Sequence, residues 1–468
     1  MRLNPVGRSR HWTVGRSTFT LDTQMKTTAL VALALTLAVA TPGLAEDFYV
    51  AEGGTGTGLS CTSPRSVSWF GTAGNWATPK QAGKIGAGDV VRLCGTISSR
   101  FTLQGSGTSG NYIAIDGAGA TLATSVTFAT NNKSWWIIRN VTWQDGSNDT
   151  LFDIGGGSNG IVENARADAM NDAVAFLWQF NSTIRPDQIT IRNSYFRTNN
   201  TNYGDRQFDM IFSEGATNVT VEGSYLEMRA GGAGATAHDD VIQTWQKGGT
   251  NGGPPGNWTI RNNWIVMNSA ATNDRSWLML ESLTGTNNIY SNVFLGIQGA
   301  SEANGISACC NQSGVVFNIF GNTFVAKNGA SNNVLNLAGS GTANIRNNIF
   351  HLGGQTALTG TMTKNRSNNL WFGSSIPSCS GFTGDVCGTD PMFTNYAAND
   401  FSLRSTSPAK GSGTNLGTSY DDGIAPGSAW PNPTVVPRGG VWDKGAFQGS
   451  SGSATVPSAP TNLRISSE

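Results

Sequence analysis

Charged residues are scarce in this chain. It carries 30 Lys and Arg and 30 Asp and Glu among 468 residues, so charged residues make up 13% of the sequence and the formal net charge is zero. Soluble proteins usually carry about twice that fraction, a quarter of all residues. A chain without net charge has no global field, which argues against nucleic acid or an anionic membrane surface as its partner. It also argues against disorder driven by charge repulsion.

Long apolar runs are missing too, apart from one near the N-terminus. Residues 27–40 form a Leu/Ala/Val run after Lys26, and this run is too short to span a membrane. Small residues stand three and one positions before the junction with Glu46, as signal peptidases prefer. We therefore predict that residues 1–45 are a signal peptide. Residues 1–24 are either an extended basic n-region of this peptide or the result of a start codon assigned too far upstream. The mature protein is expected to be secreted, either to the periplasm or outside the cell.

Cysteine is rare, and all six cysteines lie in the predicted mature chain. An even number of cysteines in an exported protein favours disulfides. The pairs we expect are Cys61–Cys94 and Cys379–Cys387. Cys309 and Cys310 are adjacent, so a bridge between them would be strained, and two buried thiols are the alternative. No CxxC pair or histidine cluster indicates a zinc site.

Glycine is abundant, with 60 residues, and it separates short strand-like phrases that return about every 30 residues. One phrase occurs at Ile189–Phe196, Trp258–Ile265 and Asn344–Phe350, and a second occurs at Asp209–Glu214 and Asp240–Trp245. Two short strands per repeat, with Gly/Asn turns and no helical period, predict one turn of a coil whose strands stack on the next turn. Asn at the corner tolerates a left-handed backbone and can bond to its stacked neighbour. A β-propeller would need four strands in each repeat.

Phrases at both ends of the chain resemble those of a known superfamily. They are Phe48–Gly54, Gly86–Leu93, Asp390–Phe393, Asn399–Leu403 and Asp443–Phe447. In these phrases residues 46–449 resemble the right-handed parallel β-helix proteins of the pectate-lyase-like superfamily. The resemblance implies an all-β fold, a single-stranded right-handed parallel β-helix, as one catalytic domain. Residues 450–468 form a Ser/Gly/Pro-rich tail that resembles the start of a fibronectin type III module.

The second phrase predicts which side chains face outward. Its third position is always aliphatic, so we expect the third and fifth positions to face the core, with Val174 and Phe176 among them. Positions two, four and six then face outward on three successive coils. They are Met210, Phe212, Glu214, Val241, Gln243, Trp245, Trp277, Met279 and Glu281. Such an outer face suits sugar rings, and we expect the substrate-binding residues to include Glu214, Gln243, Trp245, Trp277 and Glu281.

Histidine is almost absent from the predicted mature chain, which contains His238 and His351 alone. His238 stands beside Asp239 and Asp240 at the start of the middle phrase. Histidine moves protons near neutral pH, and an adjacent carboxylate orients it and raises its basicity. We therefore predict catalytic roles for His238, Asp239 and Asp240. The alternative for Asp240 is that of a turn residue at the start of a strand, and we expect His351 to be structural.

Four basic residues flank the same phrases and are candidates for contacts with an acidic polymer. They are Arg206 and Lys247, to which we assign catalytic roles, and Arg229 and Arg275, to which we assign substrate binding. The alternative is that they are scattered surface charges. Asp205, Asp209 and Asp274 could supply the oxygen ligands of a Ca²⁺ site, although no EF-hand-like spacing supports one.

These residues predict a secreted, monomeric polysaccharide lyase that cleaves a uronic-acid-containing polymer by β-elimination. A glycoside hydrolase on the same scaffold is one alternative, with a carboxylate pair chosen from Glu214, Asp239, Asp240 and Glu281. A non-catalytic carbohydrate binder or adhesin is the other, because fold alone does not decide function. The sequence does not specify the polymer, the mode of attack or the need for a metal.

Overall fold

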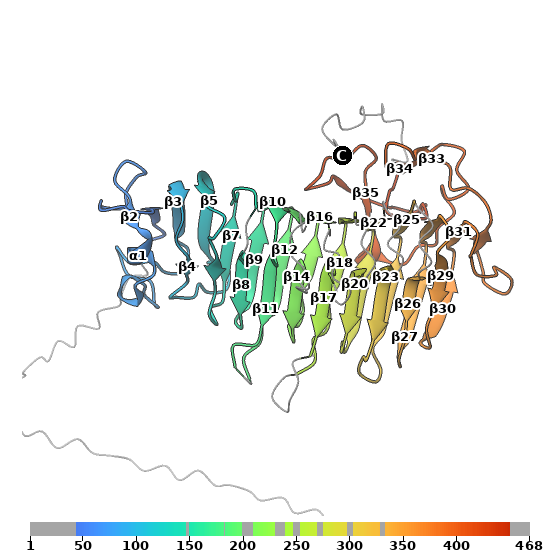
Figure 1. Cartoon of the computed structure of the whole chain (residues 1–468), viewed down its shortest axis with the longest axis horizontal. Coiled ribbons are helices and arrows are strands. Elements are labelled where there is room, and N and C mark those ends of the chain that lie inside the picture. The colour runs from blue at the N-terminus through green and yellow to red at the C-terminus, as the bar shows by residue number, and fades with distance from the viewer. Residues whose placement is uncertain are drawn as a thin grey trace, which may run out of the picture. The chain divides into compact units, whose positions relative to one another are not determined.

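The computed structural model describes residues 44–146, 149–181, 183–198, 209–229, 239–246, 253–268, 275–296, 303–327 and 333–449. Within them the chain winds into a right-handed coil, and each strand pairs in parallel with the equivalent strand of the next turn (Figure 1). The predicted parallel β-helix is therefore confirmed. One turn of the coil contributes one short strand to each of three long sheets.

The described strands of the three sheets follow the order of the coils. Sheet 1 has ten strands: β4 (Phe101–Thr102), β6 (Phe128–Ala129), β8 (Phe152–Gly155), β11 (Ala175–Trp178), β14 (Ile211–Glu214), β17 (Ile242–Trp245), β20 (Arg275–Glu281), β23 (Ala303–Cys309), β26 (Asn333–Leu337) and β29 (Thr356–Thr359). Sheet 2 has thirteen: β2 (Arg65–Ser66), β1 (Asp47–Ala51), β3 (Val90–Ile97), β5 (Ile113–Leu122), β7 (Trp136–Arg139), β9 (Ser158–Glu163), β12 (Asp187–Arg192), β15 (Thr220–Glu222), β18 (Thr259–Arg261), β21 (Thr286–Tyr290), β24 (Val316–Phe320), β27 (Thr342–Arg346) and β30 (Thr363–Ser367). Sheet 3 has nine: β10 (Arg166–Met170), β13 (Tyr195–Thr198), β16 (Tyr225–Met228), β19 (Trp264–Met267), β22 (Val293–Gly296), β25 (Thr323–Ala326), β28 (Ile349–Leu352), β31 (Leu370–Phe372) and β32 (Val386–Cys387).

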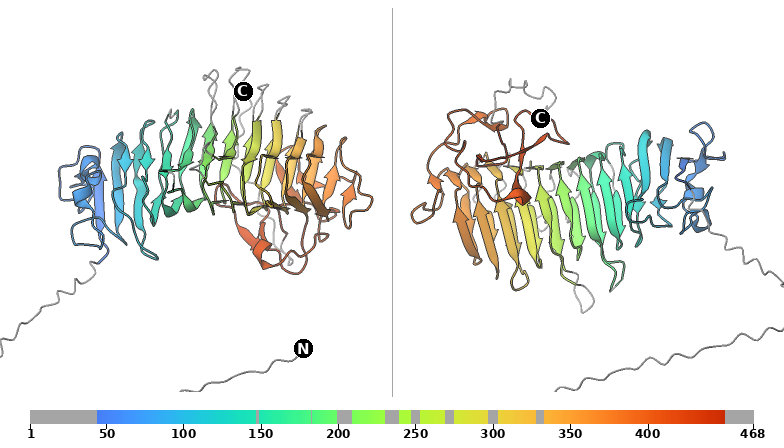
Figure 2. Two further views of the ribbon diagram at one scale, coloured as in Figure 1. Left: turned by 90° about the horizontal axis from the view of Figure 1, so that it is seen from below. Right: turned by 180° about the vertical axis from the view of Figure 1, so that it is seen from behind.

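Short elements cover the first coil and the outside of sheet 3. The helix α1 (Val67–Phe70) and the 3₁₀ turn η1 (Ala73–Asn75) lie at the N-terminal end of the coil (Figure 1). The segment after sheet 3 contains two antiparallel pairs and folds back along the coil (Figure 2). The elements of this segment are β33 (Phe393–Asn395), β34 (Asp400–Leu403), η2 (Thr418–Tyr420), β35 (Asp422–Ile424) and β36 (Val435–Pro437). Its apolar side chains pack on the outer face of sheet 3, and Tyr420 and Asp422 also contact residues of sheet 2.

The register of sheet 1 decides which side chains face the core. Ile211 pairs with Ile242 and Ile242 with Leu278, and all three side chains are fully buried. One coil earlier, however, the partner of Ile211 is Ala175 rather than Val174. The predicted alignment of that coil was thus wrong by one residue. Phe176 faces outward, because successive side chains of a strand alternate between the two faces.

The corner between sheet 2 and sheet 3 carries a ladder of polar side chains inside the coil. Its members are Ser194, Ser224, Asn263, Asn292, Asn322, Asn348 and Asn369, all buried. From Ser194 to Asn348, each backbone N–H donates to the side-chain oxygen of the next member, at 2.9–3.1 Å. The residue before each member has a positive φ, for example 54° at Asn262 and 58° at Asn347. The two predicted roles of Asn at this corner are confirmed, but two neighbouring residues share them. The first residue, such as Asn262, adopts the left-handed backbone, and the second, such as Asn263, bonds to its stacked neighbour.

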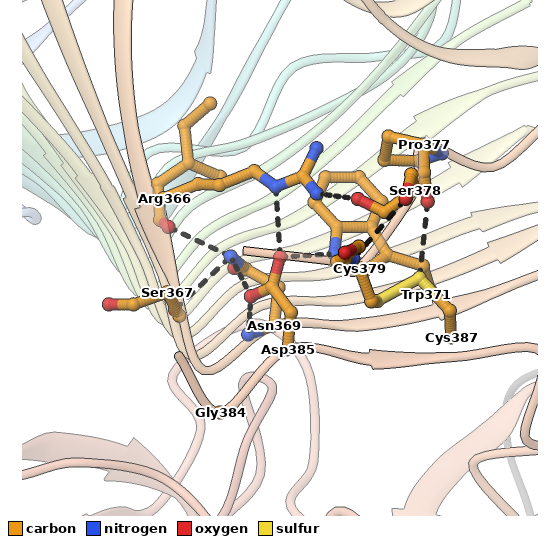
Figure 3. A network of polar contacts seen from close by, with 12 residues as sticks. Arg366, Ser367, Asn369, Trp371, Pro377, Ser378, Cys379, Gly384, Asp385 and Cys387 are labelled. Carbon is orange, nitrogen blue, oxygen red and sulfur yellow. Dashed lines mark hydrogen bonds and ion pairs between the residues drawn. A yellow bond between two sulfur atoms is a disulfide. The ribbon is translucent and has the colours of Figure 1, made fainter. Parts of the chain in front are cut away.

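An aspartate ends this ladder. Asp385 Oδ1 accepts the backbone N–H of Asn369 at 2.8 Å, and Oδ2 accepts Arg366 Nε at 2.9 Å and Trp371 Nε1 at 3.1 Å (Figure 3). The side chain of Asp385 is fully buried, so the Arg366 guanidinium compensates its charge. The disulfide Cys379–Cys387 closes the loop that contains this aspartate. The last rung of the ladder is thus an ion pair held by a covalent bridge.

Both predicted disulfides are present, Cys61–Cys94 and Cys379–Cys387. Their Cα–Cα distances of 5.5 and 5.9 Å lie in the usual range. Among the described residues, no helix is long and apolar enough to cross a membrane. The predicted signal peptide and the tail at residues 450–468 lie outside the described residues.

Candidate functional site

The outer face of sheet 1 contains a cleft with a volume of about 630 Å³. It extends over β11, β14, β17 and β20. The described residues that line it are Thr150, Asp172, Ala173, Phe176, Asp209, Phe212, Gln243, Trp245, Met279 and Glu281. Five of them were predicted to face outward, namely Phe212, Gln243, Trp245, Met279 and Glu281, and these predictions are confirmed.

Aromatic and apolar side chains form one part of the cleft. The rings of Phe176 and Phe212 stack on adjacent strands, with centroids 5.4 Å apart and planes 18° from parallel. Trp245 is 40% exposed, which is unusual for so large an apolar side chain in this protein. Exposed aromatic faces beside polar groups are suited to the C–H faces and hydroxyls of a sugar. The cleft therefore has the composition of a carbohydrate-binding site.

Two polar side chains lie between these aromatics. Gln243 Nε2 donates to Glu281 Oε2 at 3.4 Å, while Gln243 Oε1 is buried and has no hydrogen-bond partner. The backbone of Glu281 is fixed to β17, because its N–H donates to Thr244 Oγ1 at 3.0 Å and its C=O accepts from the same hydroxyl at 3.1 Å. The Glu281 carboxylate is consequently held in the cleft, next to an amide oxygen that could still accept a hydrogen bond from a ligand.

Aspartates form the edge of the cleft where the strands of sheet 1 begin. Asp209 Oδ1 accepts the backbone N–H of Asp240 at 3.0 Å, and Asp240 Oδ1 accepts that of Ser276 at 2.5 Å. Burial raises the pKa of both carboxyls well above the ordinary value. The negative charges of Asp239 and Glu281 raise the pKa of Asp209 further, and those of Asp209 and Asp239 raise the pKa of Asp240. The Asp240 side chain is fully buried. Asp239 is 1% exposed.

The charge of the described cleft is negative. None of its ten described lining residues is basic, whereas Asp172, Asp209 and Glu281 are acidic. Calcium would need several carboxylate oxygens close together. In the part of the chain that the structure describes, the aspartates of this edge do not form such a group of three, so these residues alone do not fit a Ca²⁺ site. Asp205 and Asp274, the other predicted ligands, lie outside the described residues.

One residue that was predicted to face outward and bind the substrate is buried instead, so this prediction is wrong. The Trp277 side chain is 5% exposed and packs in the core, with its ring centroid 5.4 Å from that of Phe294. Trp277 lies within β20, whose pairing with β23 passes through Ser276 and Leu278 but not through Trp277. The adjacent side chains of Trp277 and Leu278 are both buried, so the simple alternation of faces assumed for position two does not hold there. Arg229 follows β16 of sheet 3 and forms an ion pair with Glu227 at 2.7 Å, and its role in substrate binding stays a prediction.

The remaining predicted residues are placed only in part. Glu214 pairs with Trp245 across β14 and β17, and it is 9% exposed. Arg275 begins β20, but its side chain lies outside the described residues. His238, Arg206 and Lys247 also lie outside them. His351 packs against the ring of Tyr396, with centroids 4.4 Å apart, and burial lowers its pKa, consistent with the structural role predicted for it.

The prediction missed four residues of the cleft, Thr150, Asp172, Ala173 and Phe176. A signal for Phe176 was present in the sequence. Phe176 and Trp178 alternate along β11 and Phe180 continues the spacing just after it, and their rings follow one another at 6.5 and 5.9 Å. Three aromatic residues at a period of two indicate one face of a strand, which should have set the register of this coil.

Comparisons with known proteins support the fold. No protein-family model matches the chain, and no curated protein sequence does. Among solved structures, pectate lyase Pel9A matches with a TM-score of 0.56 and 16% sequence identity, covering 86% of this chain and 96% of that one. The PL6 family alginate lyase AlyGC matches with a TM-score of 0.32 and 11% identity, covering 77% and 55%. The GH136 lacto-N-biosidase from Eubacterium ramulus gives 0.32 and 11%, covering 73% and 68%. At these identities the likeness concerns the fold alone.

Proposed function

We propose that this protein is an exported polysaccharide lyase that acts as a monomer on a uronic-acid-containing polymer. The observation that supports the proposal is the cleft on sheet 1, where Trp245, Phe176 and Phe212 adjoin Gln243 and Glu281. Its volume of about 630 Å³ is in the range of ligand sites. Two or three sugar rings of a longer chain could lie along the open face of adjacent strands.

The negative charge of the cleft bears on how such a polymer would bind. The carboxylates of a uronic acid polymer would be repelled by Asp172 and Glu281 unless positive charge lay between them. Three basic residues are close in sequence to the strands of the cleft: Arg206 precedes β14, Lys247 follows β17 and Arg275 begins β20. In the proposal these cations pair with the carboxylates of the bound polymer, and the aspartates hold the cations in place.

The proposed reaction is an elimination. His238, oriented by Asp239, takes the proton from C5 of the uronic acid, and Arg206 or Arg275 neutralises the adjacent carboxylate, which lowers the cost of the carbanion. The electron pair of the broken C5–H bond forms the C4=C5 double bond as the C4–O4 bond breaks. Lys247 supplies the proton to the departing O4. Gln243 and Trp245 bind the rings on either side of that bond.

The test is an assay of the purified protein on a panel of uronic acid polymers, read by ultraviolet absorbance and by the number of new reducing ends. Elimination gives both signals in equal number, because each cleavage leaves one unsaturated sugar. His238→Ala should lose at least about 10²-fold in rate while polymer binding remains. New reducing ends without absorbance would overturn the proposal, and so would polymer binding without any turnover.

A hydrolase is the second candidate, and one observation favours it. Asp209 and Glu281 both line the cleft, and burial raises the pKa of the Asp209 carboxyl. One protonated and one ionised carboxyl are the pair that glycoside hydrolysis needs. Neutral polysaccharides in the same assay separate the candidates, because a hydrolase releases reducing ends without absorbance and depends on Asp209 and Glu281 rather than on His238.

A further inference from the structure

Two cysteines that form no disulfide lie next to the cleft. Cys309 is the last residue of β23 and Cys310 follows it. The Cys310 thiol donates to Cys309 Sγ at 3.0 Å, and the Cys309 thiol donates to Glu281 Oε1 at 3.1 Å. Glu281 and Cys309 are paired residues of β20 and β23, and Glu281 lines the cleft. A thiol pair is thereby joined through hydrogen bonds to a carboxylate of the candidate site.

The two thiols differ in access. Cys310 is exposed at a residue with a φ of 57°, whereas Cys309 is half-buried. Burial raises the pKa of the Cys309 thiol, and the hydrogen bonds with Cys310 and Glu281 raise it further. An external disulfide would therefore meet Cys310 first. Cys309 would react second, with its proton already directed at the Glu281 carboxylate.

A bond between adjacent cysteines is unlike the two disulfides of this chain. Consecutive Cα atoms lie about 3.8 Å apart, below the usual 4.4–6.8 Å of disulfides. The Cα atoms of Cys61–Cys94 and Cys379–Cys387 are separated by 5.5 and 5.9 Å. Strained, accessible disulfides are reduced more readily than relaxed ones. A bridge at Cys309–Cys310 would consequently open under conditions in which the other two stay closed.

We propose that Cys309 and Cys310 form a reversible vicinal disulfide that makes the neighbouring cleft redox-sensitive through Glu281. The oxidant is a low-molecular-weight disulfide, RSSR. The Cys310 thiolate attacks it, forms a mixed disulfide and releases one RS⁻. Cys309 then gives its proton to Glu281, and its sulfur attacks Cys310 Sγ and expels the second RS⁻. Two cysteine thiols are oxidised and one RSSR is reduced to two thiols.

The oxidation changes the cleft through Glu281. In the thiol form, Glu281 Oε1 accepts from Cys309 and Oε2 accepts from Gln243. In the disulfide form Cys309 has no proton to donate, so Glu281 Oε1 becomes available to a ligand or to solvent. This consequence rests on the proposed function, since it needs a polysaccharide in the cleft. The formation of the disulfide does not.

The experiment equilibrates the full chain in glutathione buffers of graded composition, traps free thiols by alkylation and maps them by mass spectrometry. We expect Cys309 and Cys310 to become alkylated together, at a ratio [GSH]²/[GSSG] at least about tenfold smaller than that which opens the other two bridges. Cys309→Ser should accumulate glutathione on Cys310, because the resolving thiol is missing. Cys310→Ser, the matched control, should bind less glutathione, since Cys309 is half-buried.

Three results would overturn the proposal. The first is two free thiols in fully oxidised glutathione. The second is opening at the same ratio as the other bridges. The third is protection of both thiols from alkylation and from oxidation when an equimolar amount of Zn²⁺ is added to the reduced chain. In that case Glu281, Cys309 and Cys310 would form a metal site. Polymer affinity of the oxidised and reduced forms is compared separately, so that a failure of the lyase proposal leaves the thiol result intact.

Discussion

Trp245 and Trp277 occupy neighbouring coils and similar phrases, yet the structure gives them opposite environments. The Trp245 side chain is 40% exposed in the cleft, and the Trp277 side chain is 5% exposed in the core. Replacing each by alanine should therefore affect different properties of the protein. We expect Trp277→Ala to lower stability and Trp245→Ala to lower the affinity for a polysaccharide.

The size of the stability loss follows from what surrounds Trp277. Its ring packs on Phe294 and Phe324, and Nε1 donates to the C=O of Leu295 at 3.3 Å. A Cβ on Gly305 would come within 2.8 Å of the ring, so this side of the cavity has no side chain that could fill the space. Removing a buried aromatic side chain costs about 3–5 kcal/mol, and we expect the upper part of that range.

The affinity loss is estimated from contact area. A sugar stacked on the exposed face of Trp245 would cover on the order of 60 Å² of apolar surface, worth about 1.5 kcal/mol, or roughly tenfold in Kd. The free energy of unfolding should change by less than about 1 kcal/mol, because the side chain is partly in water already. Phe382→Ala is the matched control, since that ring is 38% exposed on another part of the coil.

Urea denaturation followed by circular dichroism measures stability, and affinity electrophoresis in polysaccharide gels measures binding. Trp277→Phe should recover part of the stability lost in Trp277→Ala. Equal destabilisation by the two alanine variants would show that the inward and outward positions have been confused. An unchanged affinity of Trp245→Ala on every polymer of the panel would refute the cleft as the binding site.

Two further predictions concern the interior. Asn292→Ala should lower the free energy of unfolding, measured in urea, by about 2–4 kcal/mol, because it leaves the Asn263 N–H and the Ile260 C=O without partners. Asn292→Ser should cost roughly half as much, since serine keeps an acceptor. Equal losses in the two variants would contradict the ladder. The pKa of Asp240 is raised in the folded chain, so this carboxyl stays protonated at pH values at which it ionises in the unfolded chain. The free energy of unfolding should therefore fall as the pH rises from about 4 towards the raised pKa. Asp240→Asn should reduce this fall, measured as the urea midpoint against pH with a chelator present. An unchanged slope would argue against a buried protonated carboxyl.

The sequence was sufficient to predict the coil because every turn repeats the same local requirements. A residue of positive φ and a stacked polar side chain recur at one corner, and Asn262–Asn263 and Asn347–Asn348 satisfy both requirements in two letters. Such a pattern is visible without any knowledge of distant contacts. The even cysteine count predicted disulfides in an exported protein, but six cysteines allow fifteen connectivities, so the count did not by itself select the two pairs that are present.

The register of the cleft was harder to predict, because a repeat phrase does not mark where a strand begins. Position two of the phrase is apolar at Met210 and Trp277, and an apolar side chain there can face either the core or a ligand. The structure buries both, although Met210 precedes β14 and Trp277 lies within β20. In the coil of Phe176 the alignment took Val174 as its aliphatic anchor, whereas Ala175 is the residue that pairs with Ile211, and the predicted faces were inverted.

The distribution of the few charges in this chain, finally, distinguishes sheet 1, which carries the candidate cleft, from the other two sheets. Along the outer face of sheet 2 the paired residues alternate in sign from coil to coil: Arg92, Asp116, Arg139, Glu163, Arg192, Glu222 and Arg261. Each carboxylate of this row has a cation beside it, as in the pair Arg192–Glu163 at 2.5 Å. Opposite charges on adjacent strands stabilise a sheet and leave little net charge for a ligand. Sheet 3 is covered by the C-terminal segment. On the outer face of sheet 1, by contrast, carboxylates adjoin exposed aromatic side chains, and none of the described residues that line the cleft is a cation. An acidic polymer could bind there only if a cationic group offset the charge of these carboxylates.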